Sequence, residues 1–119
     1  MNCSHLISLS EQEQCAAKAF VERVRQTYPE KVRQITLFGS KARGDSHAYS
    51  DMDILLIVSE ADWRFRHVIS GIAADVSLAH DVLISPRVID QEQWLKMRHH
   101  HFTFYENVQA EGIELLSMT

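Results

Sequence analysis

The stretch ITLFGSKARGDSHAYSDMDILLIV, residues 35–58, organises the rest of the chain. An apolar run typical of a β-strand comes first and ends at the dipeptide Gly39-Ser40. A basic turn with a second glycine follows, and two aspartates then open another apolar run at residues 54–58. Apolar strand formers on both sides of a glycine-containing connection predict two β-strands joined by a loop.

The two aspartates of this stretch predict a metal site. Asp51 and Asp53 are separated by one residue at the start of the second strand. Side chains at positions i and i+2 of a strand leave the same face, so the two carboxylates point the same way. Carboxylates this close repel each other unless a cation lies between them, and hard oxygen ligands suit Mg²⁺ or Mn²⁺ bound jointly with nucleotide phosphates.

The loop before the aspartates predicts a phosphate site beside the metal site. Gly39 has no Cβ, so the backbone can bend sharply and come close to a ligand. We predict that Ser40 is the N-cap of a short SKAR helix whose free amides face an anion. Lys41 and Arg43 would compensate the charge of a triphosphate. One of these two side chains could instead be solvated or pair with Asp45, and the sequence leaves this open.

These motifs resemble a known family. GS, then ten residues, then D-x-D resembles the signature of the polymerase-beta-type nucleotidyltransferase superfamily, and GSKARGD with SDMDILLIV is similar to its minimal nucleotidyltransferase branch. The later segments HDVLISPRVI and FYENVQAEGIELL are also similar to that branch, so the resemblance covers nearly everything after the first predicted helix. It implies a polymerase-beta-like nucleotidyltransferase fold, a divalent metal ion, Mg²⁺ or Mn²⁺, and ATP as the nucleotide substrate.

A third carboxylate is expected on the resembling family's mechanism. We choose Asp81, because it precedes an apolar run as Asp51 does and because HDVLISP matches the place where the family carries its third acidic residue. The resemblance implies that Asp51 and Asp53 bridge two metal ions, while Asp81 holds the ion under the acceptor hydroxyl and helps to remove its proton. Asp75 is the competing candidate if the segment ADVSL begins a strand.

The resemblance also implies a partner. Members of this branch are often the antitoxin of a two-protein module whose toxin is a HEPN-type ribonuclease, and some silence that toxin by adenylylating a tyrosine on it. One alternative is a small-molecule nucleotidyltransferase of the antibiotic-modifying kind, which normally carries an additional helical domain that this sequence lacks. The other is a partner that neutralises a toxin by contact alone, without catalysis. The acceptor and the state of assembly, self-association included, stay open.

Composition limits the class of protein. The chain of 119 residues with 45% apolar residues is expected to form a single globular domain over residues 1–119. A net charge of −4 argues against broad binding of nucleic acid. Only two cysteines, Cys3 and Cys15, are present, and we expect no disulfide between them. No secretory signal or long apolar span is evident, so we expect a soluble cytoplasmic protein without a membrane partner.

Alternating helices and strands predict an α/β domain with a small mixed sheet flanked by helices. Ser10 and Glu13 form a capping-box pattern at the start of the first helix, and Pro29 ends its pattern. The second strand is apolar throughout, so we expect it to be buried on both faces. The expected helices are 11–27, 61–78, one capped by Asp90 that extends through Met97, and 104–110; the expected strands are 32–38, 51–58, 81–85 and 113–116.

Two further groups of residues have ordinary structural explanations. His99, His100 and His101 are consecutive, so on a helix they point to different sides and cannot converge on one metal ion. Phe104 and Tyr105 lie in the segment that resembles the family's closing helix, and we interpret them as structural.

Overall fold

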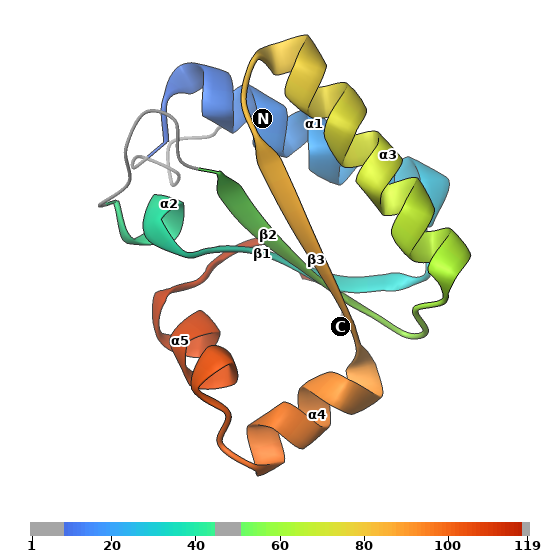
Figure 1. Ribbon diagram of the computed structural model, residues 1–119, viewed down its shortest axis with the longest axis vertical. Coiled ribbons are helices and arrows are strands. Elements are labelled where there is room, and N and C mark those ends of the chain that lie inside the picture. The colour runs from blue at the N-terminus through green and yellow to red at the C-terminus, as the bar shows by residue number, and fades with distance from the viewer. Residues whose placement is uncertain (1–8, 45–50, 118–119) are drawn as a thin grey trace.

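A four-stranded mixed sheet with helices on both faces forms the fold, as the computed structural model shows for residues 9–44 and 51–117 (Figure 1). This confirms the predicted fold class. In chain order the elements are α1 (Glu11–Thr27), β1 (Val32–Phe38), α2 (Ser40–Arg43), β2 (Met52–Val58), α3 (Trp63–His80), β3 (Ile84–Asp90), α4 (Gln91–His99), α5 (Thr103–Glu111) and β4 (Ile113–Ser117).

The strand order is β3-β2-β1-β4, so β1 and β2 are central. β1 is antiparallel to both β2 and β4, whereas β2 and β3 are parallel. A parallel pair needs a long crossover connection, and α3 supplies it. The loop after β1 and the start of β2 therefore lie at the same end of the sheet, because Phe38 pairs with Asp53.

Strand β2 separates two hydrophobic clusters, one on each face of the sheet. Ile54, Leu56 and Val58 pack with α1 and α3, which lie side by side on one face (Figure 1). Leu55 and Ile57 point the opposite way and pack with side chains of α4 and α5 on the other face. This alternation confirms that β2 is buried on both faces.

The bounds of α3 and β3 differ from the sequence prediction. Helix α3 continues to His80, and Asp81 is its C-cap in the left-handed conformation, with φ 54°. The third strand begins only at Ile84 and passes through Pro86 to Asp90, so the predicted strand 81–85 is wrong at both ends. Pro86 does not stop β3 because β3 is an edge strand, where an imino acid without an N–H group is tolerated.

The remaining helices agree closely with prediction. Helix α1 has the full capping box at Ser10. The amide of Glu13 donates a hydrogen bond to the Ser10 hydroxyl, and the Glu13 carboxylate accepts one from the Ser10 amide. Helix α3 begins two residues later than predicted because Asp62 caps it through the amide of Phe65. Within the part of the chain that the structure describes, no helix is long and apolar enough to cross a membrane.

Candidate nucleotide and metal site

The carboxylate pair lies at the start of β2. Asp51 is exposed just before the strand, and Asp53 is half-buried within it. Asp53 has the same parity as Leu55 and Ile57, so it belongs to the sheet face that α4 and α5 cover. Burial raises the pKa of Asp53, and the nearby charge of Asp51 raises it further. The two carboxylates therefore interact, as their spacing predicts.

Gly39 connects the glycine-serine loop to the carboxylate pair. Its φ of 76° is a conformation that side chains disfavour, and a Cβ atom at this position would lie 2.6 Å from Oδ2 of Asp53. Phe38, the residue before it, pairs with Asp53 across the sheet. The loop and the metal-ligating candidate are therefore in direct contact, and only glycine permits this approach.

The predicted cap of the SKAR helix is wrong by one residue. Gly39 is the N-cap of α2, and Ser40 is its first residue. The carbonyl of Gly39 accepts hydrogen bonds from the amides of Ala42 and Arg43, both at 3.1 Å, and closes the turn. Because a backbone carbonyl closes the turn, the Ser40 hydroxyl is not needed as a cap, and it stays a predicted phosphate ligand on a half-buried residue.

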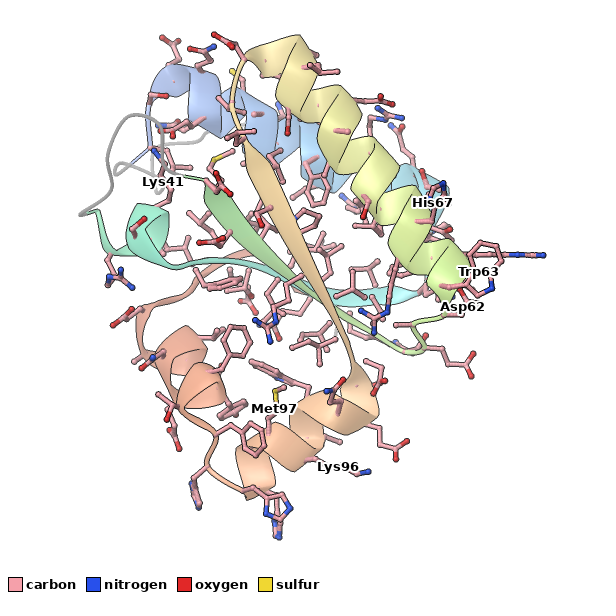
Figure 2. The ribbon with its side chains drawn as sticks, viewed as in Figure 1. Lys41, Asp62, Trp63, His67, Lys96 and Met97 are labelled. Atoms are coloured by element: carbon pink, nitrogen blue, oxygen red, sulfur yellow. The ribbon has the colours of Figure 1, made fainter. Side chains whose placement is uncertain are left out.

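Lys41 does not present its charge to solvent. Its side chain is only 4% exposed, and Nζ lies 2.5 Å from Oε2 of Glu13, whose side chain is 13% exposed. The other oxygen of Glu13, Oε1, accepts the Ser10 amide at 2.9 Å. One carboxylate thus links the start of α1 to α2, and Figure 2 shows Lys41 near the start of α1.

The pKa of Glu13 shows that its charge is stabilised. Burial raises this pKa, but the hydrogen bond and the charge of Lys41 lower it, as do the hydrogen bonds with Ser10. Burial is the largest single effect, but the lowering contributions together outweigh it, so the pKa lies below its usual value of 4.5. Glu13 is therefore ionised at neutral pH and forms an ion pair with Lys41.

Arg43 is more accessible than Lys41. Its guanidinium Nη1 lies 3.3 Å from Oε2 of Glu111 at the end of α5, and the two side chains are 43% and 39% exposed. The predicted alternative partner, Asp45, lies outside the described residues. An exposed ion pair of this kind contributes little to stability and can be exchanged for a ligand.

Asp81, the predicted third carboxylate, is the C-cap of α3. It is exposed at the end of α3, three residues before β3 begins. Ser85 is the residue that pairs with Asp53 on the neighbouring parallel strand, so its side chain leaves the same face of the sheet. Among the residues that the structure describes, no three His, Cys, Asp or Glu side chains are placed to hold one metal ion.

The two remaining carboxylates nevertheless suit one kind of metal site. Asp51 and Asp53 are oxygen donors. Burial raises the pKa of Asp53, and repulsion by the Asp51 charge raises it further, so a divalent cation between the two carboxylates would relieve that repulsion. Mg²⁺ is typically held by one or two carboxylates together with substrate phosphates and water. The pair therefore fits a metal ion that arrives with a nucleotide better than an all-protein metal site.

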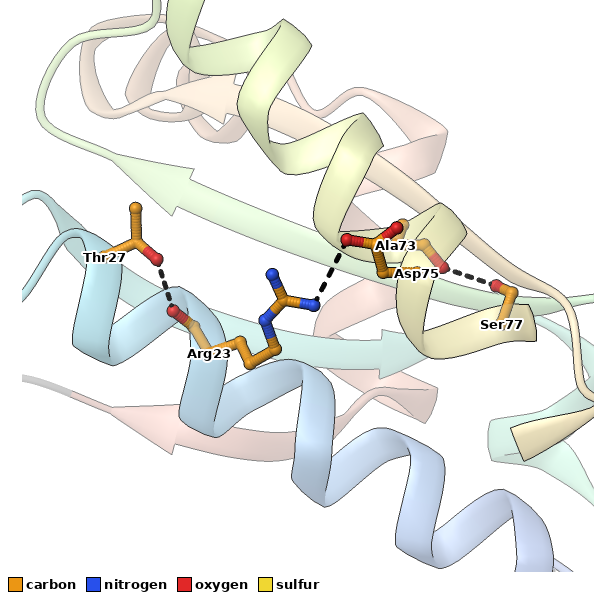
Figure 3. Close-up of polar contacts among 5 residues, drawn as sticks. All are labelled: Arg23, Thr27, Ala73, Asp75 and Ser77. Carbon is orange, nitrogen blue, oxygen red and sulfur yellow. Dashed lines mark hydrogen bonds and ion pairs between the residues drawn. The ribbon is translucent and has the colours of Figure 1, made fainter. Parts of the chain in front are cut away.

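Asp75, the competing third carboxylate, lies on the surface of α3. Its Oδ2 is 3.4 Å from Nη1 of Arg23 on α1 (Figure 3). The neighbouring Ser77 hydroxyl donates to the carbonyl of Ala73, as expected within a helix. The segment ADVSL is therefore helical, and Asp75 belongs to the contact between α1 and α3.

The histidine tract lies on the surface, whereas Phe104 and Tyr105 pack against a hydrophobic cluster, as expected. His99, His100 and His101 are exposed at the end of α4, and His101 Nδ1 lies 3.2 Å from Oε1 of Glu106. Phe104 packs edge-on against Phe38 with ring centroids 5.3 Å apart. Trp94 and Tyr105 belong to the same cluster. Cys15 is a free thiol, whereas Cys3 lies outside the described residues.

A cleft of about 360 Å³ lies at the opposite end of β2. Its lining comprises Ser59, Glu60, Ala61, Asp62, Asp90 and Glu92. Six residues of extended chain separate Asp53 from Ser59, which corresponds to about 20 Å. Asp62 and Lys41 accordingly lie far apart in Figure 2. This acidic cleft is not part of the site around Gly39 and Asp53.

Sequence reasoning missed three residues near this site. Glu13 was assigned only to the capping box, although a capping carboxylate has a second oxygen that can bind a basic residue. Ser85 and Arg87 were missed because strand three was ended at Pro86. Arg87 pairs with Leu55 in the sheet, and its guanidinium lies 4.4 Å from the ring centroid of Phe104. The alternation of polar residues in SPRVID could have indicated a longer strand.

Comparison with known proteins points to one family. Residues 17–105 match a family described as nucleotidyltransferase domain. Two relatives from Methanocaldococcus jannaschii carry the names "Putative protein adenylyltransferase MJ0604" and "Putative protein adenylyltransferase MJ0141". The first is 35% identical over 84% of this chain and 94% of its own length, and the second is 33% identical over 82% and 93%.

Solved structures with the same fold come from toxin–antitoxin complexes. A chain in a crystal structure of a toxin–antitoxin with AMP-PNP has a TM-score of 0.60 at 22% identity, over 87% of this chain and 74% of that chain. A chain in a structure of a tri-AMPylated Shewanella oneidensis HEPN toxin with its MNT antitoxin has a TM-score of 0.53 at 19% identity, over 88% and 72%. At these identities the likeness shows the fold alone.

Proposed function

Because the chain belongs to the nucleotidyltransferase domain family and is a nucleotidyltransferase, we propose that it transfers AMP from ATP to a hydroxyl group of a partner protein. The observation that carries the proposal is the contact between Gly39 and Asp53, where an added Cβ would lie 2.6 Å from the carboxylate oxygen. This contact joins a phosphate loop to a metal-binding carboxylate in one site. Nucleotidyl transfer needs both groups beside the same phosphorus atom.

The reaction assigns distinct tasks to the residues of the site. The acceptor hydroxyl oxygen forms a bond to the α-phosphorus, the bond from that phosphorus to the β-phosphate oxygen breaks, and pyrophosphate leaves while a base takes the hydroxyl proton. Gly39 and Ser40 would bind the phosphates, and Arg43 would exchange its exposed partner Glu111 for them. Asp51 and Asp53 would hold Mg²⁺ or Mn²⁺, which neutralises charge on the phosphates.

A HEPN-type toxin is the partner that we propose. Two observations support it: the relatives at 35% and 33% identity bear the name of protein adenylyltransferases, and structures with this fold come from complexes of MNT antitoxins with HEPN toxins. A protein acceptor also agrees with the exposure of Asp51 at the end of the sheet. A large acceptor can reach this position without a separate pocket.

Intact mass of the partner tests this function. The chain is co-expressed with the protein encoded by the adjacent gene, and the partner should gain about 329 Da for each AMP that is transferred. Asp53→Asn should abolish the gain. Asp75→Asn is the matched control, because it makes the same substitution at an exposed carboxylate on α3 and should leave the gain intact. If the partner is neutralised without ever gaining mass, the protein acts by contact alone.

The role of Asp81 needs a test of its own. It stays the predicted third ligand and base, and it lies at the C-cap of α3. Asp81→Asn should abolish transfer while docking to the partner stays nearly unchanged. Transfer at the wild-type rate would remove Asp81 from the site and leave Ser85, opposite Asp53, as the neighbouring side chain to examine.

A further inference from the structure

Lys41 lies in the predicted phosphate loop but forms a buried ion pair with Glu13, and direct binding of a nucleotide by Lys41 does not explain this pair. Lys41 follows directly after Gly39 and Ser40, so an exposed side chain here would be an obvious ligand for a phosphate. Its ammonium group instead lies 2.5 Å from Oε2 of Glu13, and its side chain is 4% exposed. A charge that is removed from water in this way needs its partner, because an unpaired buried charge is strongly unfavourable.

Glu13 is itself held in place from two directions. Its Oε1 accepts the amide of Ser10 at 2.9 Å, and its own amide donates to the Ser10 hydroxyl at 3.1 Å. The carboxylate therefore has a defined orientation before Lys41 is considered. Helix α1 has 17 residues and four buried positions, so its N-terminus is a rigid anchor compared with the four-residue α2.

Helix α2 depends for its position on contacts with the rest of the chain, which include the packing of Ala42 against the hydrophobic core. It has four residues, and a helix of this length is not stable by itself. Lys41 is the buried residue of α2. The same turn includes Gly39, whose Cα lies against the Asp53 carboxylate. Movement of Lys41 would consequently move Gly39 relative to the carboxylate pair.

We propose that Glu13 is a positioning residue for the nucleotide loop: it holds Lys41 in the interior and thereby sets the position of Gly39 and Ser40 beside Asp53. Lys41 then serves the shape of the loop, and direct contact with phosphate falls to Gly39, Ser40 and Arg43. The role of this loop in binding a nucleotide rests on the proposed function. The effect of Glu13 on the position of the loop rests only on the contacts of Glu13 and Lys41.

The first experiment measures the loop without nucleotide. Hydrogen exchange is followed at the amides of Ala42, Arg43 and Gly44, which close the turn on Gly39 and Ser40. Glu13→Gln should speed their exchange, and Lys41→Met should do the same. Glu22→Gln is the matched control, because Glu22 lies on the same helix in an exposed pair with Lys18 and should change nothing at these amides. Unchanged exchange in Glu13→Gln would overturn the inference.

The second experiment compares affinities for ATP with Mg²⁺ in a double-mutant cycle of Glu13→Gln and Lys41→Met, measured by calorimetry. If Lys41 acts through Glu13, each single variant should bind ATP more weakly than the wild type. The loss of affinity in the double variant should then be about tenfold smaller than the product of the two single losses. Additive losses would make Lys41 a direct phosphate ligand and overturn the inference. Tighter binding in Glu13→Gln would also overturn it, because Glu13 would then be withholding Lys41 from the nucleotide.

The two experiments distinguish a failure of the proposed function from a failure of the inference about Glu13. If the wild-type protein binds no ATP with any divalent metal, the proposed function is wrong, and the exchange comparison alone decides whether Glu13 shapes the loop. If ATP binds normally to a Glu13→Gln protein whose loop exchanges faster, the loop position does not serve nucleotide binding and the inference is wrong. Circular dichroism of each variant confirms that the chain is folded before either comparison is made.

Discussion

At the scale of single residues, the contact between Gly39 and Asp53 requires a glycine at position 39 for two reasons. The backbone conformation with φ 76° and the 2.6 Å that would separate a Cβ from Oδ2 of Asp53 both demand glycine. Gly71 shows the opposite situation, because it is exposed on α3 with no atom within 4 Å of an added Cβ. The same substitution should therefore have opposite effects at the two positions.

Gly39→Ala should destabilise the protein by about 1–3 kcal/mol through backbone strain and weaken binding of ATP with Mg²⁺ by displacing Asp53. Gly71→Ala is the control and should stabilise it by about 0.5–1 kcal/mol, because alanine is the better helix former. Urea denaturation of the two variants and the wild type measures both effects. A Gly39→Ala protein as stable as the wild type would mean that the loop can move away from Asp53.

The raised pKa of Asp53 makes a prediction about pH. The folded protein holds the proton of Asp53 more tightly than the unfolded chain does. Above the raised pKa of the folded state, ionised Asp53 therefore lowers the stability of the protein. This loss of stability disappears as the pH falls below 3.8, the usual pKa of the carboxyl group. Without metal, Asp53→Asn should match or exceed the wild-type melting temperature at pH 7, and the difference should shrink toward pH 3.5. A marked loss of stability in Asp53→Asn at pH 7 would identify Asp53 as a structural residue.

At the scale of elements, α1 and α2 are joined by a carboxylate whose pKa is lowered. A lowered pKa contributes stability that is fully present above the unfolded value and is lost as the pH falls through the folded value. The wild type should therefore exceed Glu13→Gln in stability at neutral pH, and the gap should close below pH 4.5. Chemical denaturation between pH 7 and pH 3 measures the gap, with Glu22→Gln as a control that should show little pH dependence. A gap that stays constant with pH would show that the charge of Glu13 is not what stabilises this junction.

Helix α4 depends on its cap, because its nine residues are too few for a stable isolated helix. The Oδ1 atom of Asp90 accepts the amide of Gln93 at 2.7 Å. Asp90→Ala should cost about 1 kcal/mol, and Asp90→Ser, which can cap as well, should cost little. Thermal unfolding compares the two. Equal losses would show that α4 is stabilised by the interaction of the Asp90 charge with the helix dipole and not by the capping hydrogen bond.

At the scale of the whole molecule, folding brings residues 13, 39–43 and 51–53 together at one end of the sheet. A nucleotide that binds there should stabilise the protein by linkage, by about 2.7 kcal/mol at a concentration 100 times the dissociation constant. The rise in melting temperature with ATP and Mg²⁺ should be smaller in Ser40→Ala and absent in Asp51→Asn/Asp53→Asn. That double variant should be no less stable than the wild type without ligand. A full rise in the double variant would place the nucleotide elsewhere.

The sequence by itself determined the order and type of the elements and the carboxylate pair. These follow from local rules: alternating or continuous apolar runs, the capping box at Ser10, and the short spacing that keeps Asp51 near Asp53. The continuous apolar run after Asp53 also indicated correctly that β2 is buried on both faces. Each of these inferences needs only neighbours within a few residues.

Only the tertiary structure decided which distant residues meet. The edge position of β3 lets the strand pass through Pro86, and the register of β3 on β2 places Ser85, not Asp81, opposite Asp53. The position of the start of α1 beside α2 brings Glu13 to Lys41 across 28 positions in the sequence, the difference between residues 41 and 13. Strand register and helix packing depend on the whole core, so no local pattern contains them.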